Sequence, residues 1–238
     1  MNCTPADSDG HHRAPPYCNC RSPEYRADLR YYSNKPVKGC ACGEDATDKM
    51  EWTWDADQKH PSCEFMDANC SVVFHPIYSQ GSSVVRGSKR LEMGMHHYWE
   101  VKIVSCLSGT DVMIGIGTDK VDLLEHQYRF TSPLGLNDQS YGYSYRGVIQ
   151  HAGCLKYYGK KYTRGCIVGV HLNLQAGTME FYLNRRTQGL AFTGLALDPS
   201  ISYYPMACST SAKSVVKLIN ATAYPDNLQF NCMRKVAR

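Results

Sequence analysis

The sequence contains no long hydrophobic run. No stretch of its 238 residues approaches the roughly 20 consecutive apolar residues that a membrane-spanning helix requires. The opening residues, MNCTPADSDGHHRAPP, also lack the apolar core of a secretory signal peptide. We therefore expect an intracellular protein, in the nucleus, the cytoplasm or both, with no membrane partner.

The sequence also has no dense basic stripe. Its formal net charge is only +4, and its Lys and Arg residues are scattered except for Arg234, Lys235 and Arg238 near the end. A nucleic-acid groove requires clustered basic residues interleaved with aromatic ones. We expect no nucleic-acid partner.

Residue patterns typical of an enzyme are missing as well. His96 and His97 have no third ligand at a metal-like spacing, and no Cys lies in a local motif with an activating base. Glu100 and Glu180 could be read as the carboxylate pair of a carbohydrate-active sandwich, but strand alternation predicts that both lie on solvated outer faces. We expect no enzyme, no catalytic residue, no cofactor and no metal site, with a lectin-like or carbohydrate-active sandwich as an alternative.

Twelve cysteines are present, and in an intracellular protein we expect free thiols, mostly buried in strands. The first 48 residues are polar and rich in turn formers, which predicts a flexible segment. This segment contains Cys18, Cys20, Cys40 and Cys42. Four thiolates could hold zinc, although gaps of one residue are shorter than those of usual zinc sites. Zinc binding and exposed thiols both remain open.

From Glu51 onward, short apolar runs alternate with Gly, Pro, Asn, Asp and Ser, a pattern typical of β-strands. The predicted strands are 71–75, 98–105, 112–117, 140–145, 166–174, 178–183, 189–192, 204–208 and 214–219. Gln175, Ala176 and Gly177 form a predicted hairpin turn in which Gly permits positive φ. Because no sustained helical periodicity occurs between residues 71 and 219, the pattern predicts two antiparallel sheets packed face to face.

The end of the chain has a different period. Leu228, Cys232 and Val236 are four residues apart, which places them on one face of a short predicted helix. Such a face can pack on its own domain or dock on a partner, and the spacing alone favours packing on its own domain, because apolar stripes usually face a core.

Several motifs occur in the order typical of a SPRY domain. They are HYWEV at 97–101, GTDVMIGIG at 109–117, Gly142-Tyr143, and LQAGTMEFY at 174–182. Other motifs resemble the SPRY domain-containing SOCS-box family, namely CACGE at 40–44, WTWD at 52–55, YPMACST at 204–210 and LQFNC at 228–232. The resemblance implies an all-β fold, a SPRY (B30.2-like) antiparallel sandwich over 49–222 that follows the segment 1–48 and precedes the truncated start of a SOCS box at 223–238.

In that family the first SOCS-box helix carries a Leu-x-x-x-Cys-x-x-x-apolar pattern that inserts into elongin C. Leu228, Cys232 and Val236 match this pattern, which favours docking on a partner. The implied partners are elongin B/C and, with a full SOCS box, cullin 5 and its RING partner. The alternative is a stand-alone SPRY peptide-binding module without ligase recruitment.

The resemblance also implies that loops at one end of the sandwich bind a short Asn-containing peptide of a target protein. The matching positions are Pro76, Ile77, Gln80, Arg86, Gly109, Thr110, Phe130, Pro133, Thr210, Ser211 and Ala212. Three of these positions differ from the relatives that bind such peptides: Phe130 stands in place of a Tyr, Pro133 in place of a Leu, and Ser211 in place of a Trp. The lost hydroxyl and indole are groups that often dominate binding energy. The implied function is a substrate-recognition adapter of an elongin B/C-cullin-RING ubiquitin ligase that promotes ubiquitination and proteasomal degradation, with its own peptide preference.

Overall fold

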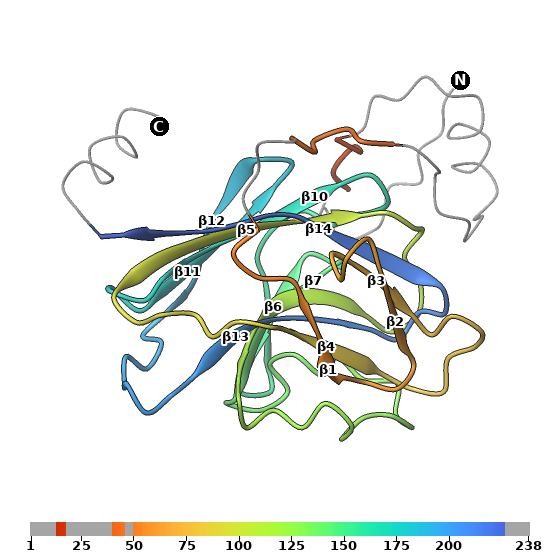
Figure 1. Ribbon diagram of the computed structural model, residues 1–238, viewed down its shortest axis with the longest axis horizontal. Helices are drawn as coiled ribbons and strands as arrows, with labels where there is room; N and C mark the ends of the chain where they lie inside the picture. The colour runs from red at the N-terminus through yellow and green to blue at the C-terminus, as the bar shows by residue number, and fades with distance from the viewer. Residues whose placement is uncertain (1–12, 18–39, 46–49, 227–238) are drawn as a thin grey trace.

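A computed structural model describes residues 13–17, 40–45 and 50–226. Within these ranges the chain forms fourteen strands in two seven-stranded antiparallel sheets (Figure 1). The first sheet contains, in spatial order, β1 (Trp54–Lys59), β4 (Ser83–Gly87), β13 (Tyr203–Ser209), β6 (Val112–Thr118), β7 (Ser140–Ser144), β8 (Val148–His151) and β9 (Cys154–Tyr157). The second contains β12 (Arg186–Thr193), β11 (Thr178–Leu183), β10 (Ile167–Asn173), β5 (Met95–Ile103), β14 (Ser214–Pro225), β3 (Ser71–Phe74) and β2 (Cys63–Met66).

The predicted all-β sandwich is confirmed, and each of the nine predicted strands corresponds to an observed one. Five short strands were not predicted: β1, β2, β4, β8 and β9. The predicted hairpin joins β10 to β11, and Gly177 has φ +62°. The predicted C-terminal helix lies outside the described residues, and no helix in the described ranges is long and apolar enough to cross a membrane.

The core lies between the sheets and follows the alternation of the strands. On β5, Trp99, Val101 and Ile103 are fully buried among side chains from both sheets. Trp52 packs edge-on against both Trp54 and Trp99, with ring centroids 5.4 and 6.0 Å apart. Each such aromatic contact contributes about 0.5–1.5 kcal/mol beyond its buried area, so this cluster anchors the region where the sandwich begins.

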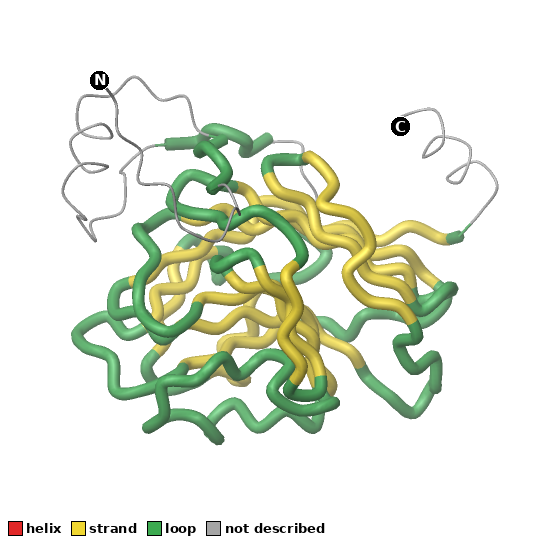
Figure 2. The backbone as a smooth tube through the Cα atoms, turned by 180° about the vertical axis from the view of Figure 1, so that it is seen from behind, coloured by secondary structure: helices red, strands yellow, loops and turns green. Residues whose placement is uncertain are grey.

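The outer face of the first sheet is covered by the long loop 119–139, which connects β6 to β7 (Figure 2). Val121 and Leu123 of this loop pack on a second apolar cluster beneath it. That cluster consists of Val84, Met113, Leu134, Met206 and Cys208. The loop is therefore held against the sheet by apolar burial as well as by hydrogen bonds.

The outer face of the second sheet is covered by residues 13–17 and 40–45, which lie above β10 and β14 in Figure 1. Glu44 forms ion pairs with Lys102 and Lys217, at 2.8 and 2.7 Å. Arg185 donates to both carboxylate oxygens of Glu100 and to the carbonyl of Gly43. Residues 40–45 are thus fixed to the sheet by charged contacts, whereas residues 13–17 are held by backbone hydrogen bonds from Ala14 N to Lys161 O and from Tyr17 N to Gly165 O, both at 2.8 Å.

This cover makes one prediction wrong. Strand alternation does place Glu100 on the outer face, since its neighbours Trp99 and Val101 enter the core. The face is not solvated, however: Glu100 is only 1% exposed and Glu180 is also buried. Glu100 lies on β5 and Glu180 on β11. These strands flank β10, so they are two strand spacings apart, about 9.5 Å. Glu100 is occupied by a bidentate pair with Arg185, so the geometry gives no support to a glycosidase pair.

Candidate functional site

Four loops meet at one end of the sandwich, and we call them the loop cluster. They are 75–82 between β3 and β4, 104–111 between β5 and β6, 119–139 between β6 and β7, and 210–213 between β13 and β14. Backbone hydrogen bonds join them in series: Lys213 N donates to His75 O, Thr210 N to Asp111 O, and Ser82 N to His126 O, each at 3.0 Å. Segments far apart in sequence therefore form one continuous surface.

Asp111 is the main polar connection within the loop cluster. Its buried carboxylate accepts hydrogen bonds from Ser132 Oγ and Ser144 Oγ, both at 2.6 Å, and from Val112 N at 2.8 Å. Burial raises its pKa, and the hydrogen bonds from the two serines oppose that rise. Thr210 adds a further link, because its Oγ1 accepts from Asp111 N at 3.0 Å. One carboxylate thus ties the loops 104–111 and 119–139 to β7.

Ser82 joins the first loop to the third. Its hydroxyl lies 2.8 Å from Arg129 O and 2.9 Å from Thr131 O, and it accepts from Thr131 N at 3.1 Å. The preceding residue has to be small, because a Cβ on Gly81 would lie 2.4 Å from the carbonyl oxygen of Gln127. This close approach sets the position of the segment that carries Phe130.

Gly109 is required for two reasons. Its φ of +77° is unfavourable for residues with a side chain, and a Cβ there would lie 2.8 Å from Thr210 Oγ1. The hydroxyl of Tyr145 also donates to Gly109 O at 3.0 Å, which fixes the exposed turn. The loop 104–111 is therefore held rigidly beside Thr210.

A buried polar group supports the loop cluster from below. His75 Nε2 donates to Ser209 O at 3.0 Å, while Ser83 Oγ lies 3.0 Å from His60 Nδ1. Burial lowers the pKa of both histidines, and the proximity of His75 lowers that of His60 further. The neutral forms of the two imidazoles are therefore favoured beneath the loop 75–82.

Large apolar side chains surround the loop cluster in contact with solvent. Ile77 and Tyr78 project from the first loop, and Tyr128 and Phe130 from the third. Their exposed fractions are 78, 64, 72 and 54%. Exposed apolar side chains gathered on connected loops are typical of interaction sites. Ile77 and Phe130 were predicted site residues, whereas Tyr78 and Tyr128 were not.

The other predicted residues divide by burial. Pro133, Thr210 and Ser211 are buried and shape the surface, and Ser211 Oγ lies 2.8 Å from Ser108 Oγ. Pro76, Gln80, Thr110 and Ala212 are exposed or half-buried on the same loops.

Arg86 is set apart from these loops. It lies within β4, where its guanidinium stacks 4.4 Å from the ring centre of Tyr204.

Sequence reasoning did not identify Asp111, Ser82 or Ser132 as site residues. Asp111 had a usable signal, because it directly precedes β6, whose residues are apolar except for Thr118 at its end, and a carboxylate in such a position is usually buried and paired. The two serines had no such signal, since short polar residues are common in any loop.

Other predicted sites lie at the ends of the chain. Leu228, Cys232 and Val236 are outside the described residues, as are Cys18 and Cys20. Across 13–17, 40–45 and 50–226, no group of three or more His, Cys, Asp or Glu side chains is arranged to hold a metal ion.

Comparison with known proteins identifies the domain. Residues 96–221 match the family model of the SPRY domain. The chain belongs to the SPRY family. The SPRY domain of human HERC1 superposes with a TM-score of 0.57 at 18% identity, covering 70% of this chain and 97% of that one. A second human SPRY domain gives 0.52 at 16% identity, covering 66% and 94%. These likenesses support the fold alone.

The chain also resembles longer proteins. It is 36% identical over 220 residues to SPRY domain-containing SOCS box protein 3 of Xenopus tropicalis, covering 92% of this chain and 60% of that protein. The Xenopus laevis protein of the same name gives the same identity and coverage. The resemblance to SPRY domain-containing SOCS-box proteins is thus confirmed, and the chain spans about three-fifths of the length of these relatives.

Proposed function

We propose that this protein is a non-enzymatic, intracellular substrate-recognition adapter. Its loop cluster binds a short Asn-containing peptide of a target protein, and Leu228, Cys232 and Val236 bind elongin C. Elongin B, cullin 5 and a RING partner complete the ligase where a full SOCS box is present. Catalysis then belongs to the partners, and the adapter promotes ubiquitination and proteasomal degradation by raising the local concentration of target lysines.

The observation that carries peptide recognition is the combination of a rigid frame with exposed apolar side chains. Asp111 and Ser82 hold the loops by buried hydrogen bonds, while Ile77 and Phe130 remain exposed above them. A preorganised surface loses little conformational entropy when it binds. The exposed Gly109 belongs to this frame, because its positive φ and its close contact with the buried Thr210 fix the shape of the loop 104–111.

The peptide should differ from that of relatives with Tyr and Trp in this surface. Phe130 offers a ring without a hydroxyl, and Ser211 is buried with its hydroxyl beside Ser108. The surface therefore offers apolar contact at Phe130 and fewer side-chain hydrogen-bond donors. We expect a preference for an apolar residue next to the Asn.

A displayed library of nine-residue peptides with Asn fixed at the centre tests recognition by the full chain. Phe130→Ala should weaken the selected peptides about tenfold or more, as loss of an aromatic anchor does. Leu190→Ala is the matched control, because Leu190 is equally exposed, 51% against 54%, but lies on β12 of the other sheet. Equal effects of the two variants, or no selection of Asn peptides, would count against this site.

Co-purification with elongin B/C tests ligase recruitment separately. Wild-type chain should bind, and a Leu228→Ala, Cys232→Ala double variant should not. Absence of wild-type binding would favour the second candidate, a stand-alone SPRY peptide-binding module, which the geometry of the loop cluster supports equally well.

A further inference from the structure

His60 and His75 lie beneath the loop 75–82 and have one hydroxyl between them. Ser83 Oγ is 3.0 Å from His60 Nδ1 and 3.5 Å from His75 Nδ1. The ring centroids are 6.4 Å apart, and the two histidines are 4% and 2% exposed. Two titratable side chains are therefore buried directly below one of the recognition loops.

The hydrogen bonds define which nitrogen of each neutral ring carries the proton. A carbonyl oxygen can only accept, so His75 Nε2 donates to Ser209 O and His75 Nδ1 is unprotonated. The backbone N–H of Ser62 donates to His60 Nδ1 at 3.1 Å, so this nitrogen is unprotonated as well. Each ring can therefore take up a further proton only at Nδ1, the nitrogen that faces Ser83.

A proton at either Nδ1 conflicts with this arrangement. On His60 it would meet the N–H of Ser62, a donor that now uses the same nitrogen as its acceptor. On His75 it would have only Ser83 Oγ as an acceptor, over the long distance of 3.5 Å. The buried arrangement therefore favours the neutral form of both rings.

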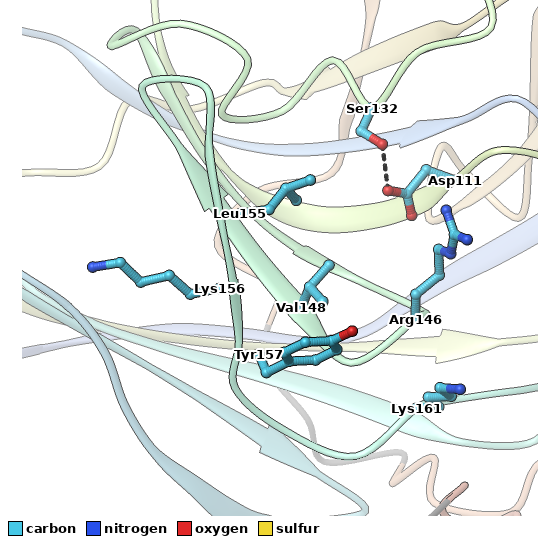
Figure 3. A pocket seen from close by; sticks show the side chains of 8 residues that line it. All are labelled: Asp111, Ser132, Arg146, Val148, Leu155, Lys156, Tyr157 and Lys161. Carbon is cyan, nitrogen blue, oxygen red and sulfur yellow. Dashed lines mark hydrogen bonds between the residues drawn. The ribbon is translucent and has the colours of Figure 1, made fainter. Parts of the chain in front are cut away.

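Among the described residues, no carboxylate lies within ion-pair distance of either imidazole. The histidines that do pair with a carboxylate are His96 and His126. The buried carboxylate of the loop cluster, Asp111, is held by Ser132 at the edge of a pocket that neither imidazole lines (Figure 3). A protonated His60 or His75 would thus be a buried cation without a counter-charge.

The other ionisable groups around the imidazoles are neutral or positive. They are Lys59 of β1, Cys63 of β2, Cys208 of β13 and Lys213 of the loop 210–213. Burial raises the pKa of both thiols, to about 12 for Cys63, so both are neutral. None of these groups can stabilise an imidazolium.

His75 also fixes the start of the loop 75–82. Its backbone N donates to Ser62 O at 2.7 Å, and its backbone O accepts from Lys213 N at 3.0 Å. Its φ of +48° is unfavourable for a residue with a side chain, so the side-chain bond to Ser209 O helps to hold this turn. Release of the imidazole would loosen the loop that carries Ile77 and Tyr78.

We infer that His75 is a positioning residue that acts, with Ser83 and His60, as a pH-dependent latch: its neutral form holds the loop 75–82 closed, and protonation releases it. Once released into water, an imidazole has an ordinary pKa of about 6.5. Lowering the pH from 7.5 to 5.5 then favours the released form by up to about tenfold, because only that form takes up the proton. The functional consequence rests on the proposed function: peptides that require the closed loop bind less tightly as the released form becomes populated.

Hydrogen exchange of the full chain without peptide, followed by mass spectrometry at pH 7.5, 6.5 and 5.5, tests the latch. After correction for the intrinsic effect of pH, exchange of residues 76–82 should rise about fivefold to tenfold at pH 5.5. Exchange of the core strand β6 should not change, which separates local release from global unfolding. His75→Gln keeps a donor for Ser209 O but does not titrate, so the rise should fall below about twofold.

Two further variants identify the histidine responsible. His151→Gln removes a partly exposed histidine from β8 and should retain the wild-type rise. His126→Gln removes the histidine of the loop 119–139 that pairs with Glu125, and should retain it too. The inference is overturned by a constant exchange rate in the wild type, by an undiminished rise in His75→Gln, or by loss of the rise in His126→Gln.

The wild-type comparison of residues 76–82 with β6 decides the matter even where His75→Gln is too unstable to measure. The assay contains no peptide and no ligase component. A negative result would therefore remove the latch and leave the proposed recognition of an Asn-containing peptide untouched, and failure of peptide recognition would leave the latch standing.

Discussion

Removing the carboxylate of Asp111 should destabilise the protein and disorder its recognition surface together. Asp111→Ala leaves three donors without their acceptor: Ser132 Oγ, Ser144 Oγ and Val112 N. Each hydrogen bond to a charged group contributes about 1.5–3 kcal/mol. Two effects reduce the loss: both serine hydroxyls can rotate toward other acceptors, and the variant no longer buries a charged group. We therefore expect the free energy of unfolding to fall by about 2–4 kcal/mol. Urea unfolding followed by fluorescence of the buried tryptophans measures it.

Asp111→Asn separates the loss of hydrogen bonds from the loss of charge. The amide keeps the shape and one acceptor, and the Ser132 hydroxyl can turn to accept from the new NH₂ group. The cost should be about 1–2 kcal/mol. Ser132→Ala removes one donor and should cost about 1 kcal/mol, with weaker binding of library-selected peptides because the loop 119–139 loses its tie to Asp111. A loss below 1 kcal/mol in Asp111→Ala would refute the reasoning that Asp111 holds the loops together.

The pH dependence supplies an independent check of the same residue. Burial raises the pKa of Asp111 in the folded state. Between its unfolded value, about 3.9, and the higher folded value, the folded protein binds more protons than the unfolded chain, so its stability falls as pH rises. Asn does not titrate, so Asp111→Asn lacks this contribution to the fall in stability with rising pH. The destabilisation caused by the variant should therefore be largest near pH 4 and shrink toward pH 7, and urea unfolding at both pH values measures the change.

Three further predictions concern other parts of the structure. Arg185→Ala leaves the buried carboxylate of Glu100 without its bidentate partner and should cost about 2–4 kcal/mol in urea unfolding, below the full value for a buried pair because Arg185 is partly solvated. His75→Gln should flatten the fall in stability from pH 7.5 to 5.5. Burial lowers the pKa of His75, so stability is present above its unfolded value, about 6.5, and is lost as pH falls. Gly81→Ala should cost about 1–3 kcal/mol and reduce peptide binding, because its Cβ displaces the loop 119–139.

Strand alternation explains how much of the fold was predictable. The nine predicted strands contain apolar residues that enter the core, and their periodicity is visible in the sequence. The unpredicted β1 and β9 lie at the edges of the first sheet, and β9 is exposed along its whole length. Such strands need no apolar pattern, because neighbouring backbone hydrogen bonds position them. β4 and β8 each contain only two consecutive apolar residues, Val84-Val85 and Val148-Ile149, and so short a run does not predict a strand.

The candidate site was predictable only in part, because its loops are brought together by the fold. Motif order placed Ile77, Phe130 and Gly109 in matching loops, but no local pattern indicated that Ser82 reaches Arg129 or that Asp111 reaches Ser132. The same limit applies to Glu100. Strand alternation correctly predicts that Glu100 lies on the outer face of its sheet. It cannot predict that this face is covered, because the cover consists of residues 13–17 and 40–45, which are far away in sequence.

These covers also indicate where a partner can bind. The loop 119–139 packs over the first sheet, and residues 13–17 and 40–45 pack over the second. Apolar side chains that stay uncovered after both faces are occupied are informative. Among the described residues, the four most exposed large hydrophobic side chains are Ile77, Tyr128, Tyr157 and Tyr78. Three of the four belong to the loop cluster, so the proposed peptide-binding surface lies where the fold leaves the most apolar area in water.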